Sequence, residues 1–218
     1  MFTKDIGIDL GTANTLVYMR GKGIIIREPS VVAVNTRTDK CRYVGKEAKD
    51  VIGRTPGSIV AASPHKDGVI ADFDIATTML QEFIKKALKG TIFTKANVII
   101  CIPSGVTAVE RRAVRESCKK AGANNVLIVE EPMAAAIGAS LDVGEPSGNI
   151  IVDIGGGTTD IAVISLGGSV VNASLKVAGD KFDESIVKYI KKKHNVMIGE
   201  RTAEDLKINI LCLPMISI

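Results

Sequence analysis

The sequence predicts an α/β fold, and two observations lead to this prediction. Apolar, β-rich segments alternate along the chain with segments whose apolar residues recur at helical spacing. The chain also contains an internal repeat, because placing Asp9 on Asp153 aligns two similar segments 144 positions apart. We therefore expect two similar subdomains, each presenting one glycine-rich turn to a shared cleft.

In the first half of the chain, β-rich runs surround a glycine turn and are followed by helical patterns. Asp74 is the expected cap of one helix, a capping box at Thr107 and Glu110 opens another, and that helix is expected to end at Gly122. The expected strands are Lys4–Leu10, Thr15–Arg20, Gly23–Arg27, Ser30–Asn35, Asn97–Ile102 and Val126–Val129. The expected helices are Lys46–Ile52, Asp74–Lys89, Thr107–Gly122 and Pro132–Ala139.

The second half repeats the order of strands around a glycine-rich turn. Thr202 is the expected cap of the last helix. The expected strands are Asn149–Ile154, Asp160–Leu166 and Val170–Val177, and an amphipathic helix is expected over Lys181–Lys193.

Composition excludes several classes of function. The chain of 218 residues is 46% hydrophobic and 24% charged, with a net charge of +4 and no Trp. Because no basic stripe carries interleaved aromatic residues, we expect no nucleic-acid partner. The four cysteines are scattered, which favours reduced thiols in a cytoplasm, and the two histidines are isolated. No apolar run approaches the roughly 20 residues that cross a bilayer.

The chemistry of the two turns fits a polyphosphate. Glycines leave consecutive backbone N–H groups free to bind an anion. The carboxylates of Asp9 and Asp153 would repel phosphate. Their positions are explained if Mg²⁺ lies between them and the phosphates and contacts the carboxylates through water. Hydroxyl donors are expected from Thr12, Thr15, Thr158 and Thr159.

The alternative is that each turn is only a glycine hairpin between core strands. For a single turn that alternative would be favoured, but two copies with Asp, Gly and Thr in the same register favour phosphate binding. Neither turn is a Walker A loop or a dinucleotide fingerprint, because neither opens a helix.

Several motifs resemble those of a known group of proteins. The two turns resemble the phosphate motifs of the actin, heat-shock chaperone and sugar kinase superfamily, and Glu130-Glu-Pro-Met-Ala-Ala-Ala-Ile-Gly resembles its first connecting helix. Within that superfamily the chain is similar to the bacterial MreB/Mbl family over about residues 1 to 209. The pieces that carry this are Ile6-Gly-Ile-Asp-Leu-Gly-Thr-Ala-Asn-Thr, Glu28-Pro-Ser-Val-Val-Ala-Val, Asp67-Gly-Val-Ile-Ala-Asp, Val109-Glu-Arg-Arg-Ala and Ile198-Gly-Glu-Arg-Thr-Ala-Glu-Asp.

The resemblance implies an actin-like ATPase fold of the ribonuclease H-like type, with ATP and Mg²⁺ as cofactors. Glu131 would orient the water that attacks the γ-phosphate, assisted by Thr159. From the residues alone, Glu131 could equally compensate the N-terminal charge of its helix. The implied nucleotide-binding residues are Gly11, Thr12, Ala13, Asn14, Gly155, Gly156, Gly157, Thr158, Gly179, Asp180, Glu204 and Lys207, and the implied metal residues are Asp9 and Asp153.

The resemblance also implies a cell-shape function. Family members form filaments on the inner face of the cell membrane and organise cell-wall elongation proteins, which implies a cytoplasmic protein peripheral to that membrane. Ile92 and Phe93 occupy the position of the family's membrane loop and could dip into an anionic interface, or could anchor the loop by burial.

The chain departs from the family pattern at its end. We expect a first domain over residues 1–140 with a small subdomain at about 32–75, an incomplete second domain over 141–209, and an aberrant tail over 210–218. A chain truncated in this way would expose an apolar face, bind ATP more weakly than micromolar and have low stability. The alternatives are a remnant that neither hydrolyses ATP nor polymerises, and, less favoured, a chaperone-type ATPase core.

Overall fold

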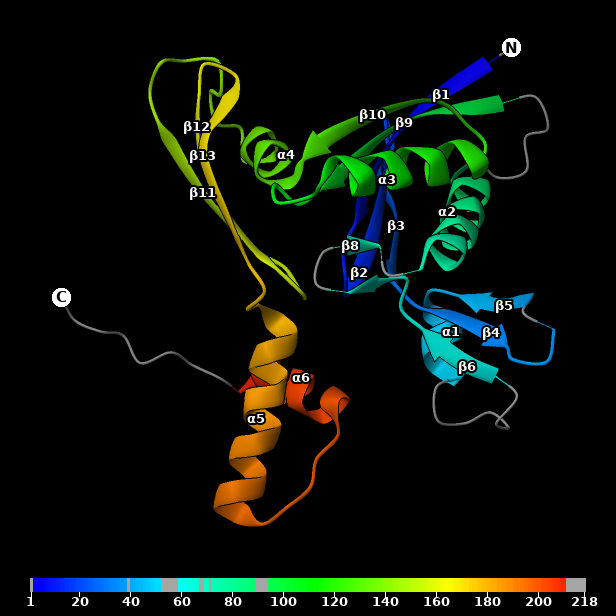
Figure 1. Cartoon of the computed structure of the whole chain (residues 1–218), viewed down its shortest axis with the longest axis vertical. Coiled ribbons are helices and arrows are strands. Elements are labelled where there is room, and N and C mark those ends of the chain that lie inside the picture. Colours follow the sequence, from blue (N-terminus) through cyan, green and yellow to red (C-terminus); the bar gives the residue numbers. More distant parts are fainter. Residues whose placement is uncertain are drawn as a thin grey trace.

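The first half is built on a five-stranded sheet with helices packed on one face. The computed structural model describes residues 2–38, 40–51, 59–66, 69–70, 72–88 and 94–210. The strand order is β10-β9-β1-β2-β3, and β1 runs antiparallel to β2 and parallel to β9. The bounds are β1 Phe2–Leu10, β2 Asn14–Met19, β3 Gly23–Pro29, β9 Thr94–Ile102 and β10 Ala123–Glu130. Helices α2 (Phe73–Leu88) and α3 (Ala108–Lys120) contact each other over this sheet (Figure 1).

The core of this half forms where alternate strand residues meet the apolar stripe of α2. Ile6 and Ile8 of β1 and Phe83 of α2 are almost completely buried in one cluster. Strand residues two apart point to the same face, so the period-2 pattern of β1 supplies this core directly.

The stretch expected as a small subdomain contains its own sheet, with strand order β5-β4-β6. Its elements are β4 Val32–Asn35, β5 Lys40–Val44, α1 Lys46–Val51 and β6 Ile59–Ala62. The short pair β7 (His65–Lys66) and β8 (Val69–Ile70) leads from it to α2.

The second half contains an antiparallel sheet in the order β11-β12-β13. Leu10 pairs with Thr15 in the first hairpin, and Ile154 pairs with Thr159 in the second, so the two copies have the same register. Helix α4 (Glu131–Gly138) contacts strands of both sheets and lies between them in Figure 1. The remaining bounds are β11 Asn149–Ile154, β12 Thr159–Ser165, β13 Gly168–Leu175, α5 Gly179–His194 and α6 Glu200–Asn209.

One face of the second sheet is uncovered. Ile6, Ile8 and Leu10 are 1–7% exposed, whereas their counterparts Ile150, Val152 and Ile154 are 56–70% exposed. In the first copy these positions lie in the same core cluster as α2, and no described helix covers them in the second copy. The apolar face expected for the second half is therefore present.

Local signals for helix ends were right at one helix and wrong at two. Both hydrogen bonds of the Thr107–Glu110 capping box form, and Gly122 follows α3 with a φ of +99°. The prediction of Asp74 as a cap is wrong, because Asp72 Oδ1 accepts the N–H groups of Asp74 and Ile75 at 3.0 Å and Asp74 lies inside α2. Thr202 likewise lies inside α6, whose N-cap is Gly199.

Two other predictions fall on residues that the structure does not describe. Ile92 and Phe93 of the expected membrane loop lie outside the described ranges, as does the tail from 211 to 218. Among the described helices, none is long and apolar enough to cross a membrane.

Candidate functional site

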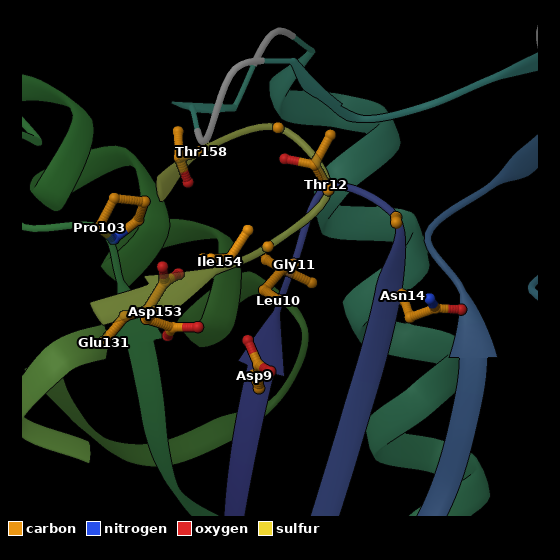
Figure 2. Close-up of a pocket in the computed structure, with 14 residues that line it drawn as sticks. Asp9, Leu10, Gly11, Thr12, Asn14, Pro103, Glu131, Asp153, Ile154 and Thr158 are labelled. Carbon is orange, nitrogen blue, oxygen red and sulfur yellow. The ribbon is translucent and has the colours of Figure 1, made fainter. Parts of the chain in front are cut away.

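The two glycine-rich turns line one cavity of about 300 Å³. The end of β1 and the end of β11 supply the turns, the loop after β9 supplies Pro103, and the first turn of α4 supplies Glu131 (Figure 2). This volume is at the lower end of the range for small-molecule sites. The lining residues are Asp9, Leu10, Gly11, Thr12, Ala13, Asn14, Pro103, Glu131, Asp153, Ile154, Gly155, Gly156, Gly157 and Thr158.

The tips of the two turns are so close that only glycine fits between them. A Cβ at Gly156 would lie 2.8 Å from Ala13 Cβ, and one at Gly157 would lie 2.8 Å from Thr12 Oγ1. Real Cβ atoms do not approach other atoms this closely, so the glycines let the two repeats meet. Backbone N–H groups from both turns can therefore face one ligand.

The first turn is held by a buried hydroxyl pair that the sequence analysis did not single out. Ser30 Oγ donates to the carbonyl oxygen of Gly11 at 2.6 Å and lies 2.8 Å from Thr15 Oγ1. Thr15 and Ser30 are both fully buried, so the Thr15 hydroxyl supports the turn instead of facing a ligand. Ser30 belongs to the Glu28-Pro-Ser motif of the family resemblance, but no local sequence pattern predicts its contact with a turn 19 residues earlier.

Adjacent threonines of the second turn have different surroundings. Thr158 is buried and lines the cavity. Thr159 Oγ1 instead donates to the carbonyl oxygen of Val177 at 2.7 Å, and Thr159 is not among the lining residues. The structure thus brings Thr158, and not Thr159, to the cavity with Glu131.

Three carboxyl groups gather at the cavity. Burial, and then the charge of Asp153, raises the pKa of Asp9, and burial followed by Asp160 raises the pKa of Asp153. The pKa of Glu131 rises to about 8, mainly through burial and then through Asp9, Asp160 and Asp153. Crowded acidic groups in a low-dielectric site favour a bound cation.

The carboxylate oxygens at the cavity suit a hard divalent ion whose remaining ligands are waters and phosphate oxygens. Asp9 and Asp153 offer carboxylate oxygens, which Mg²⁺ prefers. Within the described residues no three His, Cys, Asp or Glu side chains have the spacing of a complete metal site. Mg²⁺ in proteins usually keeps several waters and is held by one or two carboxylates together with phosphate oxygens. Cys101 stays a neutral thiol beside this cluster, because burial and then Asp9 raise its pKa to about 12.

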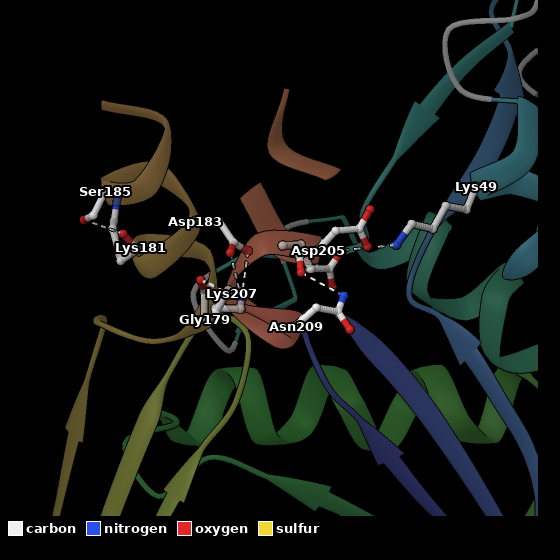
Figure 3. Close-up of polar contacts among 9 residues, drawn as sticks. Lys49, Gly179, Lys181, Asp183, Ser185, Asp205, Lys207 and Asn209 are labelled. Carbon is white, nitrogen blue, oxygen red and sulfur yellow. Dashed lines mark hydrogen bonds and ion pairs between the residues drawn. The ribbon is translucent and has the colours of Figure 1, made fainter. Parts of the chain in front are cut away.

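The residues expected on the adenosine side lie beside the second turn and do not line the cavity itself. The N–H groups of Gly179 and Asp180 donate to the carbonyl oxygens of Gly155 and Gly156 at 3.1 and 2.9 Å. Lys207 Nζ donates to the Gly179 carbonyl oxygen at 3.2 Å and pairs with Asp183 (Figure 3). The start of α5 is therefore joined to the second turn and to α6.

Glu204 occupies a different position from its neighbours. Its carboxylate lies 3.7 Å from Lys49 Nζ of α1, so it pairs with the small sheet region. Both side chains are partly exposed, and such surface pairs contribute little to stability.

Comparisons with known proteins agree with this geometry. The family model for "MreB/Mbl protein" matches residues 3–216. The chain is 54% identical over 210 residues to the cell shape-determining protein Mbl of Bacillus cereus, covering 96% of this chain and 63% of that protein. The chain thus spans less than two thirds of that relative.

Solved structures show the same architecture. The chain is similar to MreB 5 of Spiroplasma citri bound to AMPPNP, with a TM-score of 0.87, 44% identity, and coverage of 96% of this chain and 63% of that one. It is also similar to the MamK double helical filament, with a TM-score of 0.79, 25% identity, and coverage of 94% and 64%. The expected actin-like fold is confirmed.

Proposed function

This chain belongs to the MreB/Mbl family, and from that premise we propose that its cleft binds Mg-ATP in a cell shape-determining filament system. The observation that carries the proposal is the meeting of two glycine turns over three carboxyl groups in one cavity. The nucleotide bound to the similar Spiroplasma protein supports it.

The proposed role of each residue follows from the chemistry of its groups. Backbone N–H groups of Gly11–Asn14 and Gly156–Thr158 would bind the phosphate oxygens, whereas the Gly155 N–H donates to the Thr158 carbonyl oxygen at 2.9 Å within the turn. Asp9 and Asp153 would hold Mg²⁺ through water, and the ion would neutralise phosphate charge when bound. Glu131 would orient the attacking water, and the Thr158 hydroxyl would take the assisting role that the family resemblance implied for Thr159.

The proposal extends to assembly. We infer that the protein forms filaments and contacts the inner face of the membrane, as the family resemblance implies. We also infer that it works with cell-wall elongation proteins. The filament of the similar MamK protein supports self-association. The membrane loop at Ile92 and Phe93 rests on the sequence resemblance alone.

Titration with a fluorescent ATP analogue, with and without Mg²⁺, tests the binding proposal. We expect Asp9→Asn and Asp153→Asn each to lower the Mg-dependent affinity about tenfold or more, because a charge-assisted contact is lost. Asp74→Asn is the matched control, since Asp74 is exposed on α2 and far along the chain from both turns. Equal affinities of all four proteins would contradict an Mg-nucleotide site between the turns.

A second candidate function is favoured by the uncovered face of β11–β13. A chain with this face uncovered would keep the cleft yet neither hydrolyse ATP nor polymerise. Sedimentation of polymer combined with phosphate release distinguishes the two: nucleotide-dependent pelleting with phosphate release supports the filament, and binding without either supports the second candidate.

A further inference from the structure

Asp160 is a buried charge with no ion-pair partner in the described part of the chain. Asp160 is 1% exposed. It follows the second turn on β12 and lies directly across from Asp153 in the strand pairing, so both side chains project from the same face. Like charges placed opposite each other in a sheet are destabilising. The fold alone therefore gives no reason for a carboxylate here.

The internal repeat shows that the hairpin does not require this charge. Asp160 corresponds to Leu16 in the first copy, and Leu16 pairs across from Asp9 in the same register. Along β12, Ala162 and Ile164 share the face of Asp160 and are buried against α4. An apolar residue at position 160 would continue that buried row of β12.

The hydrogen bond of Asp160 spans the two halves of the molecule. Its Oδ1 accepts the backbone N–H of Ser104 at 3.2 Å, across 56 residues of sequence. Ser104 follows Pro103, which lines the cavity, and the next residue, Gly105, is close to β13, since a Cβ there would lie 3.5 Å from Ser174 Cβ. The loop that forms one wall of the cavity is thus attached to the strand that follows the second turn.

We propose that Asp160 is a positioning residue, which anchors the 103–105 loop to the second phosphate turn and so holds the cavity wall in place for the nucleotide. The role requires an acceptor atom at Oδ1 and not the negative charge itself. This inference rests on the proposed function for the nucleotide, while the anchor can be measured without any ligand.

Two variants separate the acceptor from the charge. Asp160→Leu places the residue of the first repeat, removes the acceptor, and is expected to fold because it also removes the repulsion with Asp153. Asp160→Asn removes the charge and keeps an oxygen that can accept from Ser104. Ser104→Ala is the matched control, since it keeps the backbone N–H and removes a hydroxyl that is buried without a hydrogen-bond partner among the described residues.

The first readout is amide hydrogen exchange at Ser104 in the ligand-free protein, and the second is affinity for the Mg-bound ATP analogue. We expect Asp160→Leu to speed exchange and weaken binding by about tenfold each, the scale of one lost charge-assisted hydrogen bond. Asp160→Asn and Ser104→Ala should stay within about threefold of the parent protein for both readouts.

The results separate a positioning role from a merely structural one. Unchanged exchange and affinity in Asp160→Leu would overturn the proposal, and so would an affinity loss in Asp160→Asn equal to that in Asp160→Leu. If the parent protein binds no Mg-ATP, the proposed function is wrong, and Ser104 exchange alone then decides whether the anchor exists.

Discussion

Glu131 shows how tertiary surroundings change the chemistry of one residue. From sequence it could be a catalytic group or a helix N-terminal charge, and the residues alone left both open. In the fold it lies half-buried at the cavity with Asp9 and Asp153, and its pKa rises to about 8. A carboxyl group kept largely protonated near neutral pH is typical of a functional site and not of an exposed helix end.

This pKa predicts a pH dependence of stability in the metal-free protein. The folded state holds the Glu131 proton up to about pH 8, whereas the ordinary pKa is 4.5, so the folded state binds more protons between these values. Stability should therefore fall as pH rises through this window. Glu131→Gln lacks this proton linkage. Its free energy of unfolding should therefore rise relative to that of the parent protein, by on the order of a few kcal/mol, when the pH is raised from about 5 to about 8.5.

Urea unfolding in EDTA at the two pH values measures this gain. Glu116→Gln is a control for the loss of one glutamate charge, because Glu116 lies half-exposed on α3 away from the cavity. A constant difference between Glu131→Gln and the parent protein at both pH values would contradict the buried, crowded environment.

At the scale of elements, the approach of the two turns depends on glycines. We predict that Gly156→Ala separates the turns, because its Cβ would lie 2.8 Å from Ala13 Cβ and 3.3 Å from Ala13 N, and backbone atoms must then move. Affinity for the Mg-bound ATP analogue should fall about tenfold or more, since a displacement near 1 Å disturbs preorganised N–H groups.

Gly138→Ala is the control for this change. Gly138 ends α4, and an added Cβ there meets no atom within 4 Å. It should leave affinity unchanged and be neutral or stabilising by up to about 1 kcal/mol. Nucleotide titration and thermal unfolding of both variants make the comparison, and equal affinities would mean that the turns tolerate separation.

Helix boundaries show which local signals are reliable. The box at Thr107 and Glu110 was predicted correctly, because two reciprocal hydrogen bonds specify one start. Asp74 was predicted wrongly because Asp72, two residues earlier, offers the same chemistry, and the position of the chain entering α2 decided between them.

At the scale of the molecule, the repeat creates matched positions with opposite surroundings. Ile6 is 1% exposed in the core under α2, and its counterpart Ile150 is 70% exposed. Identical side chains at equivalent positions of equivalent strands should therefore contribute very differently to stability.

We predict that Ile6→Ala lowers the free energy of unfolding by about 2–5 kcal/mol, through lost burial and an internal cavity. Ile150→Ala should change it by less than about 0.5 kcal/mol, because the side chain is already in solvent. Urea unfolding of the two variants provides the measurement. A cost for Ile150→Ala close to that for Ile6→Ala would show that the second sheet face is covered in solution.

The sequence by itself determined the α/β class, most strands and helices, the repeat, and the two turns with Asp9 and Asp153. These follow from local signals, namely apolar periodicity, glycine and capping patterns, which act over a few residues. It also singled out Glu131, through its motif, as a residue of the site.

Only the tertiary structure decided which hydroxyls face the cavity and which groups join the two halves. Thr158 and Thr159 are adjacent and chemically identical, and the hydrogen bond to Val177 is what turns one of them away. The bonds from Ser30 to Gly11 and from Ser104 to Asp160 join residues far apart in the chain. Such contacts depend on the packing of whole elements, which no local pattern encodes.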